Sequence, residues 1–448
     1  MTLVWRCLYF SYRMASAMRY WTQRRLSRAG LGVLVAIIVA GIMGPDSENN
    51  VAYQAFTFLV VLLLIAVLFT FFYRGRFSAK RYLPRFGTAG TPLRYRVLIK
   101  NLTRRTQNSL TLLETLADPR PSFGDWRAAK MAEDRHLRSF RVGKRPRVNS
   151  FRKANVQEAT VPAIPPLAEV EVHAELMPLR RGVLRFYGVT LARPDPLGLV
   201  RSFARVRLPQ TALILPKRYD LPSIALPGTM KYQAGGVVLA SNVGQSDEFV
   251  ALRDYRHGDP PRHIHWRSWA RVGKPVVKEF EDEFFVRHAL VLDTFIEHPN
   301  SEIFEEAVSV AASFVCSIRT QESLLDLLFV GPDSYCLTAG RGLARSEQML
   351  EILASVQPCH QGYFRSLEEL VLDHVAAVSG CICVLLGWDQ QRRDFVEKLR
   401  GLGVPVLVLV VTGPGEGARI SPGPMRDEPD RFHVLEAGRV EAGLARLG

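Results

Sequence analysis

The chain has 448 residues, six cysteines and a formal net charge of +15 at pH 7. This length predicts about two or three domains with sizeable hydrophobic cores. The excess positive charge lies in residues 1–30, 74–85 and 119–155, and the rest of the chain is slightly acidic. Nearly neutral main domains exclude a body that binds nucleic acid through its charge. The cysteines have no zinc-like spacing and do not require an oxidising compartment.

Two uncharged apolar runs predict a pair of membrane-spanning helices. They are residues 29–44 and residues 51–73. A helix rises about 1.5 Å per residue, so the second run is long enough to cross a hydrocarbon core of about 30 Å. The first run is short for a span and needs local thinning of the bilayer or snorkelling by Arg28. A cleaved signal peptide is the alternative for the first run.

The charges around the two runs predict their orientation. Arginine and lysine lie on the outer sides of both runs, whereas the connection between them holds Asp46 and Glu48 and no positive charge. The positive-inside rule therefore places both ends of the chain in the cytoplasm. We expect residues 1–28 to be a basic cytoplasmic segment, and residues 29–73 to be two transmembrane helices.

Residues 74–230 predict a β-sandwich of immunoglobulin-like kind. Apolar and polar residues alternate over 93–99 and 170–176, and Gly and Pro separate about six or seven short strands without a helical stripe. A basic insert, residues 119–155, interrupts this pattern with many charges and few aliphatic residues. Its composition predicts a mobile excursion. Its closeness to a span also predicts attraction to anionic lipid, and the two interpretations are compatible.

Residues 231–285 link the sandwich to the rest of the chain and mix arginines, histidines and carboxylates with aromatic side chains. Buried charges must be paired, so we expect arginine–carboxylate contacts around aromatic anchors. This position between two domains predicts a clamp that joins them. The predicted clamp residues are Arg253, Asp254, Tyr255, Gly258, Asp259, Arg262, Ile264, His265, Trp266, Lys278 and Glu279.

Three histidines in the same segment, His257, His263 and His265, are a candidate zinc site. An H-x-H pair on a strand places both rings on one face, which is compatible with zinc. No further cysteine or histidine accompanies them at a ligand-like spacing. A structural role is therefore the favoured interpretation of these histidines.

Residues 286–448 predict an α/β domain, because continuous apolar strands alternate with amphipathic helical stripes. The predicted strands are residues 289–292, 323–330, 381–386 and 404–411. This alternation is typical of a parallel sheet covered on both faces, whose ligands bind at the carboxyl ends of the strands. Asp293 and Asp389 each follow a strand, so Asp293, Glu297 and Asp389 form a candidate carboxylate site for Mg²⁺.

The sequence LRDYRHGDPPRHIHW at residues 252–266 resembles the hallmark segment of a bacterial family, the domain of unknown function numbered fifty-eight. The resemblance extends to VKEFE at 277–281, RRG at 180–182 and DPLGL at 195–199. It implies a von Willebrand A-like domain at the C-terminal end and a MoxR-type AAA+ ATPase as partner. Such domains often bind a divalent cation through an aspartate followed by hydroxyl residues. Here Phe295 and Glu297 stand in place of the two hydroxyl residues, and phenylalanine supplies no oxygen ligand. The favoured interpretation is therefore a degenerate edge that binds a partner without a metal, or binds nothing.

The sequence contains no P-loop, G-x-S-x-G or H-E-x-x-H motif. We therefore expect a non-enzymatic scaffold or adaptor on the cytoplasmic face of a bacterial inner membrane, in contact with lipid. With the ATPase, it would assist the assembly or remodelling of a client complex. The alternative is a metal-dependent hydrolase or transferase that acts at the strand edge or at the histidine cluster.

Overall fold

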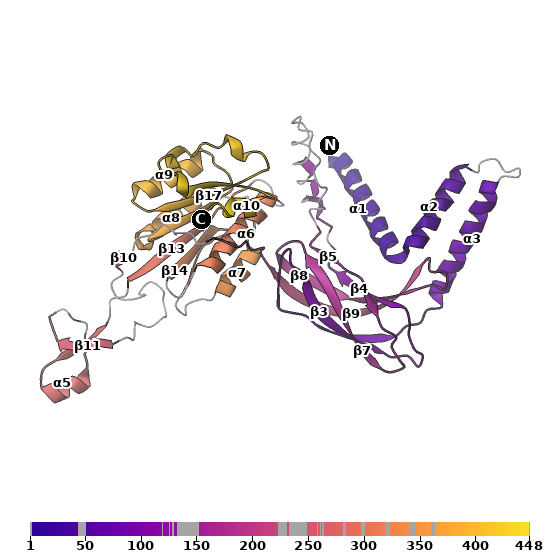
Figure 1. Ribbon diagram of the computed structural model, residues 1–448, viewed down its shortest axis with the longest axis horizontal. Coiled ribbons are helices and arrows are strands. Elements are labelled where there is room, and N and C mark those ends of the chain that lie inside the picture. Colours follow the sequence, from indigo (N-terminus) through magenta and orange to yellow (C-terminus); the bar gives the residue numbers. More distant parts are fainter. Residues whose placement is uncertain are drawn as a thin grey trace. The chain divides into compact units, whose positions relative to one another are not determined.

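A computed structural model describes most of the chain. The described residues are 2–43, 51–118, 120–124, 126–127, 130–131, 152–222, 231–232, 249–257, 259, 261, 264–280, 284–296, 301–318, 323–340, 346–359 and 363–447. They fall into two compact units, Met1–Lys217 and Arg218–Gly448. Helices and several β-sheets are both present, which confirms the prediction of a mixed α/β protein (Figure 1).

The first unit begins with three helices, α1 (Thr2–Arg25), α2 (Arg28–Met43) and α3 (Val51–Phe71). Among the described helices, only α3 is long and apolar enough to cross a membrane. Helix α2 is apolar but shorter, and it packs against α3 (Figure 1). The prediction of a helix able to span a membrane is therefore confirmed for α3, and a hairpin of two spans stays a prediction. Helix α1 was not predicted.

Two sheets complete the first unit. One has the strand order β1-β3-β7-β5, with β1 (Phe77–Tyr82), β3 (Leu93–Asn101), β7 (Glu169–Pro178) and β5 (Ala154–Val156). The other has the order β2-β9-β8-β4-β6, with β2 (Phe86–Thr88), β9 (Arg201–Leu215), β8 (Gly182–Pro194), β4 (Leu110–Leu116) and β6 (Ala159–Val161). Neighbouring strands are antiparallel except β2 and β9, which are parallel.

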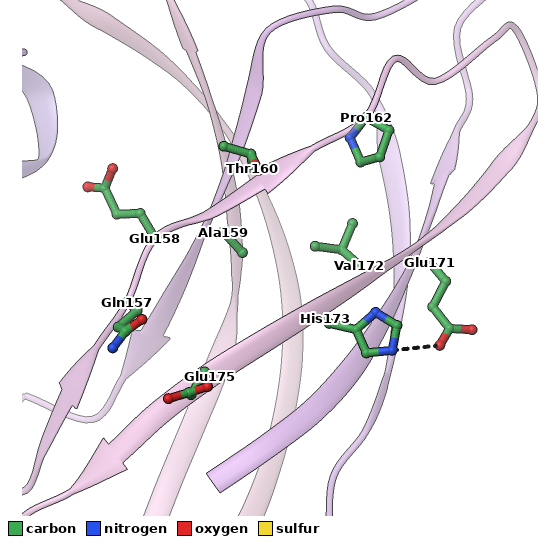
Figure 2. Close-up of a pocket in the computed structure, with 9 residues that line it drawn as sticks. All are labelled: Gln157, Glu158, Ala159, Thr160, Pro162, Glu171, Val172, His173 and Glu175. Carbon is green, nitrogen blue, oxygen red and sulfur yellow. Dashed lines mark ion pairs between the residues drawn. The ribbon is translucent and has the colours of Figure 1, made fainter. Parts of the chain in front are cut away.

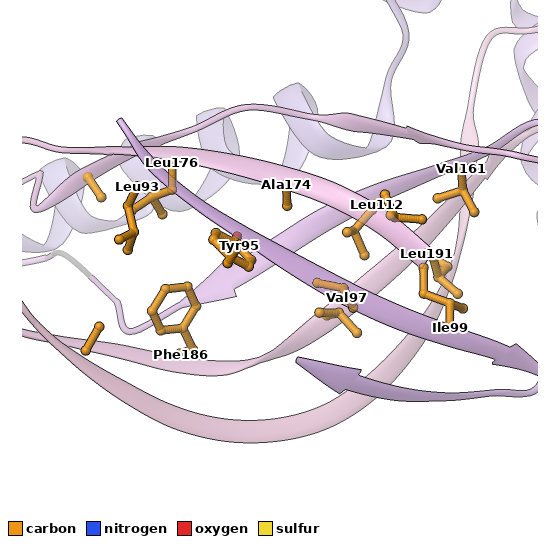
Figure 3. Packing of buried hydrophobic residues seen from close by; sticks show 14 of the residues in the cluster. Leu93, Tyr95, Val97, Ile99, Leu112, Val161, Ala174, Leu176, Phe186 and Leu191 are labelled. Carbon is orange, nitrogen blue, oxygen red and sulfur yellow. The ribbon is translucent and has the colours of Figure 1, made fainter. Parts of the chain in front are cut away.

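The core of the first unit lies between these two sheets. Alternate residues of β3 are buried, as its apolar–polar pattern predicts. Tyr95 and Val97 of β3 share one hydrophobic cluster with Phe186 and Leu191 of the other sheet (Figure 3). The rings of Tyr95 and Phe186 meet edge to face with centroids 6.0 Å apart. The two sheets therefore form a sandwich with a shared interior.

A buried ion pair also joins the two sheets. Arg81 of β1 donates from Nε to Glu114 Oε1 at 3.2 Å and from Nη2 to Glu114 Oε2 at 2.6 Å. Its remaining nitrogen, Nη1, donates to the carbonyl of Leu208 and to Gln210 Oε1, both at 3.2 Å. Burial raises the pKa of Glu114, and the Arg81 guanidinium opposes that shift. Because both side chains are almost fully enclosed, each depends on the other for its charge to be tolerated.

The second unit is built on a sheet with the strand order β15-β14-β13-β16-β17-β18, and β10 pairs with β13 beside it. The strands are β10 (Lys231–Tyr232), β13 (Phe284–Leu292), β14 (Ser323–Val330), β15 (Ser334–Ala339), β16 (Gly380–Leu385), β17 (Val406–Thr412) and β18 (Phe432–Glu436). Strands β13, β14, β16, β17 and β18 are parallel, whereas β15 and β10 are antiparallel to their neighbours. Strands β16 and β17 are buried along their whole length, as expected when helices cover both faces.

Helices cover this sheet. They are α6 (Glu302–Ser317), α7 (Ser346–Ser355), α8 (Arg365–His374), α9 (Gln390–Gly401) and α10 (Val440–Leu444). Short 3₁₀ helices accompany them: η2 (Val375–Ala377), η3 (Gly417–Arg419), η4 (Gly423–Met425) and η5 (Pro429–Arg431). Helices α8 and α9 pack with Ala289 and Val291 of β13 in one cluster. Leu290 and Leu292 alternate with those residues and point to the other face, and α6 also contacts β13 (Figure 1).

A separate two-stranded sheet precedes β13 in the chain. It pairs β11 (Phe249–Asp254) with β12 (Val276–Phe280) in antiparallel register, and α5 (Trp266–Val272) lies between them in sequence. Helix α5 ends at Gly273, whose φ of 72° is the left-handed conformation that glycine adopts without strain. We call these elements and their connections the β11–α5–β12 module.

The buried ion pair of the first unit gives a test of stability. We expect Arg81→Ala to lower the free energy of unfolding by about 3–5 kcal/mol, because it leaves the Glu114 carboxylate buried without a cation. Replacing both residues with leucine should recover much of this loss. Urea denaturation of the full chain, monitored by circular dichroism, measures the effect.

The matched control is Arg94→Ala, because Arg94 pairs with Glu175 across the same sheet but is 80% exposed. A surface pair of this kind contributes only about 0–1 kcal/mol. If Arg81→Ala lowered stability no more than Arg94→Ala does, the buried pair would not hold the two sheets together.

Candidate functional site

The carboxyl edge of the parallel sheet carries a fully buried aspartate. Asp293 follows β13 directly and is 0% exposed. Its Oδ1 accepts the backbone N–H of Phe295 at 2.9 Å. Its Oδ2 accepts the backbone N–H of Leu386 at 3.0 Å and the Nε–H of Arg392 at 2.7 Å. These bonds tie the end of β13 to the end of β16 and to α9.

Arg392 is the centre of this arrangement. Its Nη1 forms an ion pair with Asp389 Oδ2, and its Nη2 donates to the carbonyl of Phe295 at 3.1 Å. Asp389 also caps α9, because its Oδ1 accepts the backbone N–H of Arg392 at 3.0 Å. The Arg392 guanidinium lies 5.0 Å from the centre of the Phe364 ring. We call Asp293, Asp389 and Arg392 the arginine cluster.

Burial and charge act in opposite directions on this cluster. Burial raises the pKa of Asp293, while Arg392 and the two backbone amides oppose the rise. Burial alone would lower the pKa of Arg392, but the carboxylates of Asp293 and Asp389 raise it above its usual value. The arginine therefore stays protonated, and the chain itself supplies the positive charge that two carboxylates at one edge require.

Two of the three predicted metal-site residues meet here. Asp293 and Asp389 both contact Arg392, while Glu297 lies outside the described residues. Within the described ranges, no group of three or more His, Cys, Asp and Glu side chains is arranged to hold a metal ion. The complete Mg²⁺ site therefore stays a prediction.

Sequence reasoning did not identify Arg392, although a signal was present. Arg392 lies three residues before Phe395 and is buried on the same helical stripe as Phe395, Val396 and Leu399. A charged residue on an apolar stripe requires a buried partner. Asp389, three residues earlier in the sequence, is one such partner.

The predicted clamp residues of the β11–α5–β12 module form a local network. Arg253 donates from Nη1 to Asp259 Oδ2 at 2.7 Å and from Nη2 to Asp259 Oδ1 at 2.8 Å. The backbone N–H of Arg256 also donates to Asp259 Oδ2, at 2.8 Å. The hydrogen bonds from Arg253 and from this amide lower the pKa of Asp259 to about 2. The pair closes the loop that follows β11.

Backbone pairing and ring stacking hold the rest of the module. The N–H of Tyr255 donates to the carbonyl of Pro275 at 3.0 Å, and the N–H of His265 donates to that of Val276 at 2.8 Å. Ile264 forms an isolated bridge with Val277. Trp266 stacks on Trp269 with ring centroids 5.1 Å apart and is 63% exposed.

The module also contains the other predicted clamp residues and the predicted histidines. Asp254 is exposed at the end of β11, and Lys278 and Glu279 pair with β11 through their backbones. His257 is exposed, and His265 Nδ1 lies 2.7 Å from Ser268 Oγ. Gly258, Arg262 and His263 lie outside the described residues. The role of the module as an interdomain clamp, and zinc binding by its histidines, stay predictions.

A pocket of about 430 Å³ lies in the first unit, at the edge formed by β6 and β7 (Figure 2). It is lined by Gln157, Glu158, Ala159, Thr160, Pro162, Glu171, Val172, His173 and Glu175. Each glutamate already has an arginine partner: Glu158 pairs with Arg201, Glu171 with Arg96 and Glu175 with Arg94. The pocket therefore offers no carboxylate without a cationic partner to a metal ion, and the arginine cluster is the better-defined site.

The arginine cluster predicts that the second unit is stable without a bound metal ion. We expect Arg392→Met to lower the free energy of unfolding by about 3–5 kcal/mol, because Asp293 would remain buried without a cation. The same change at Arg365, whose pair with Glu369 is exposed, should cost at most about 0.5 kcal/mol. Thermal melting of the full chain measures both effects.

Mg²⁺ should leave the Tm of the wild-type chain unchanged. A rise in Tm with Mg²⁺ would show that a metal binds the folded state.

The Arg253–Asp259 pair predicts an acid transition in the module. The pKa of Asp259 is depressed in the folded state, so its stabilising effect is present above the ordinary aspartate pKa of about 3.9 and disappears as the pH falls towards about 2. Carbon-13 NMR of labelled aspartate should show one carboxyl that titrates near this lower limit. Arg253→Leu should raise its midpoint towards the ordinary value.

Arg256→Ala is the control for this titration, because the main contribution of Arg256 comes from its backbone N–H, which the variant keeps. The midpoint should move less in this variant than in Arg253→Leu. Equal shifts in the two variants would mean that general positive charge, and not the paired hydrogen bonds, lowers the pKa of Asp259.

Comparisons with known proteins agree with the resemblance found in the sequence. Residues 251–416 match the model of a family described as "Protein of unknown function DUF58". A Bacillus subtilis protein, "Uncharacterized protein YeaD", is 30% identical over 182 residues, which are 40% of this chain and 44% of that protein. The chain thus matches less than half the length of this curated relative.

Two solved structures show weak likeness to the chain. The CARDB domain of the PF1109 protein from Pyrococcus furiosus is 12% identical, with a TM-score of 0.17, and the match covers 31% of this chain and 93% of that domain. A β-glucosidase from Listeria innocua is 13% identical, also with a TM-score of 0.17, over 31% of this chain and 16% of that enzyme. Scores this low support no conclusion about fold or function. The region of residues 251–416, which holds most of the β11–α5–β12 module and all of the arginine cluster, matches the DUF58 family of proteins of unknown function, and this match confirms the resemblance predicted from the sequence.

Proposed function

We propose that this protein is a membrane-anchored, non-enzymatic adaptor on the cytoplasmic face of a bacterial inner membrane. In this proposal the second unit is a von Willebrand A-like domain that contacts a MoxR-type AAA+ ATPase, and the pair assists the assembly or remodelling of a client complex. The observation that carries the proposal is the arginine cluster at the carboxyl edge of the parallel sheet.

That edge is where an open α/β sheet binds its ligands. A hydrolytic metal site keeps an open coordination position for a water molecule. A guanidinium offers no such position and does not lose its proton in proteins. Arg392 is 8% exposed and directs Nε, Nη1 and Nη2 to protein oxygens. The described part of the edge therefore favours a fixed binding surface over an active site.

The first unit supports the membrane location. Helix α3 is uncharged, and almost none of its most apolar stretch is buried inside the protein. Exposed apolar side chains along a helix of this length suit a hydrocarbon environment. Arginines flank α2 and α3 on one side, and by the positive-inside rule this charge supports the proposal that both ends of the chain are cytoplasmic. The second unit would then face the cytoplasmic ATPase.

Affinity purification of the full chain from solubilised bacterial membranes tests the proposal. A MoxR-type ATPase should be captured with the chain, and its rate of ATP hydrolysis should change when the purified chain in lipid nanodiscs is added. Asp389 is exposed at the edge, so Asp389→Arg should weaken capture of the ATPase. Arg365→Glu on α8 should not weaken it. The proposal fails if no such ATPase is captured. It fails equally if the chain alone shows a metal-dependent hydrolytic activity that Asp293→Ala abolishes.

A further inference from the structure

Helix α1 has two chemically different faces. Its inner face carries Trp5, Tyr9 and Tyr12, which contact the described start of the basic insert. Trp126 lies 6.0 Å from Trp5, 5.5 Å from Tyr9 and 5.8 Å from Tyr12, measured between ring centroids. The Tyr9 hydroxyl donates to the carbonyl of Pro121 at 2.8 Å. The protein therefore covers this face over the first half of α1, from Trp5 to Tyr12.

The outer face of α1 is apolar and uncovered. It is formed by Leu3, Phe10, Met14, Met18 and Trp21, whose exposed fractions are 75%, 68%, 67%, 62% and 54%. At 3.6 residues per turn, these positions lie along one side of the helix. Large apolar residues exposed in one continuous row mark an interaction surface.

We infer that α1 lies in the membrane interface, with its outer face in the boundary between lipid headgroups and acyl chains. This inference rests on the proposed membrane anchor and adds a third membrane-contacting element to it. An amphipathic helix with basic residues and large apolar side chains is suited to this position. The occupant of the outer face is therefore an anionic lipid surface.

Continuity with the apolar helices supports lipid as the occupant. Only Leu26 and Ser27 separate α1 from α2. The backbone N–H of Ser27 donates to the carbonyl of Leu199 at 3.0 Å, and its Oγ donates to that of Gly198 at 2.5 Å. These two hydrogen bonds fix the corner between the helices. Helix α1 therefore ends next to the start of α2, at the base of the proposed membrane segment.

Charge supports the same occupant. Helix α1 carries five arginines and no acidic residue. Arg24 and Arg25 contact the protein, at the carbonyl of Glu114 and the ring of Phe203. Arg6 and Arg13 are exposed beside the outer face, where they suit anionic headgroups. A second copy of α1 would bring like charges together without a compensating acid.

Spin labels on the full chain test this inference. Serine replaces the exposed and half-buried cysteines Cys7, Cys316, Cys336 and Cys359, and single nitroxides are placed by Phe10→Cys, Met14→Cys or Gln23→Cys. Gln23 is exposed on the opposite side of α1 and is the matched control. In nanodiscs of phosphatidylcholine and phosphatidylglycerol, labels at positions 10 and 14 should collide more often with oxygen than with a water-soluble nickel complex. The label at position 23 should show the reverse.

A fourth label, by Val61→Cys on α3, separates this inference from the membrane anchor itself. If label 61 is in lipid while labels 10 and 14 are in water, the inference fails and the anchor stands. If all of them are in water, both fail. Spin–spin broadening between labels at position 14 of two chains, with little access for either reagent, would overturn the inference in favour of self-association through α1.

Discussion

The second unit depends on the pairing of one buried carboxylate with one buried guanidinium. Asp293 ends the central strand β13, and Arg392 lies in the first turn of α9. Neither charge is tolerated alone in a dry interior. Because the arginine also reaches Asp389 and the carbonyl of Phe295, the pair fixes where β13 ends and α9 begins. The end of β13 and the start of α9 are therefore held together by the contacts of one side chain.

The first unit also contains a buried arginine–carboxylate pair, and this pair joins two sheets. Arg81 and Glu114 belong to different sheets, so their paired hydrogen bonds fix the way in which the sandwich closes. In both units the arginine also donates to oxygens other than those of its first carboxylate, so that all three nitrogens of the planar fork make hydrogen bonds. Such pairs confer less stability than an apolar core of equal volume, but they are directional. The chain thus buries charged pairs at places where the relative orientation of two strands, or of a strand and a helix, must be fixed.

The regular elements of the second unit were largely predictable from sequence, because their periodicity is strong. The pattern predicted strands at residues 323–330, 381–386 and 404–411, which correspond to β14, β16 and β17. The patterns of β15 and β18 were missed, because these strands are only partly buried and lack a continuous apolar run. The carboxylates at the edge were predictable from strand ends. The place of Arg392 on an apolar stripe indicated a buried partner, but the sequence could not show that this partner is Asp293, 99 residues away.

The junction of α1, α2 and the sandwich shows a constraint that no periodic pattern reveals. Asp195 accepts the backbone N–H groups of Leu197 and Val200 and so shapes the turn that carries Leu199. Leu199 and Val200 pack with Ala66 of α3, and a Cβ at Gly30 of α2 would collide with the Leu199 carbonyl. Glycine is therefore needed at position 30 for the helix to approach the turn. These contacts join α2 and α3 to the turn between β8 and β9 of the sandwich.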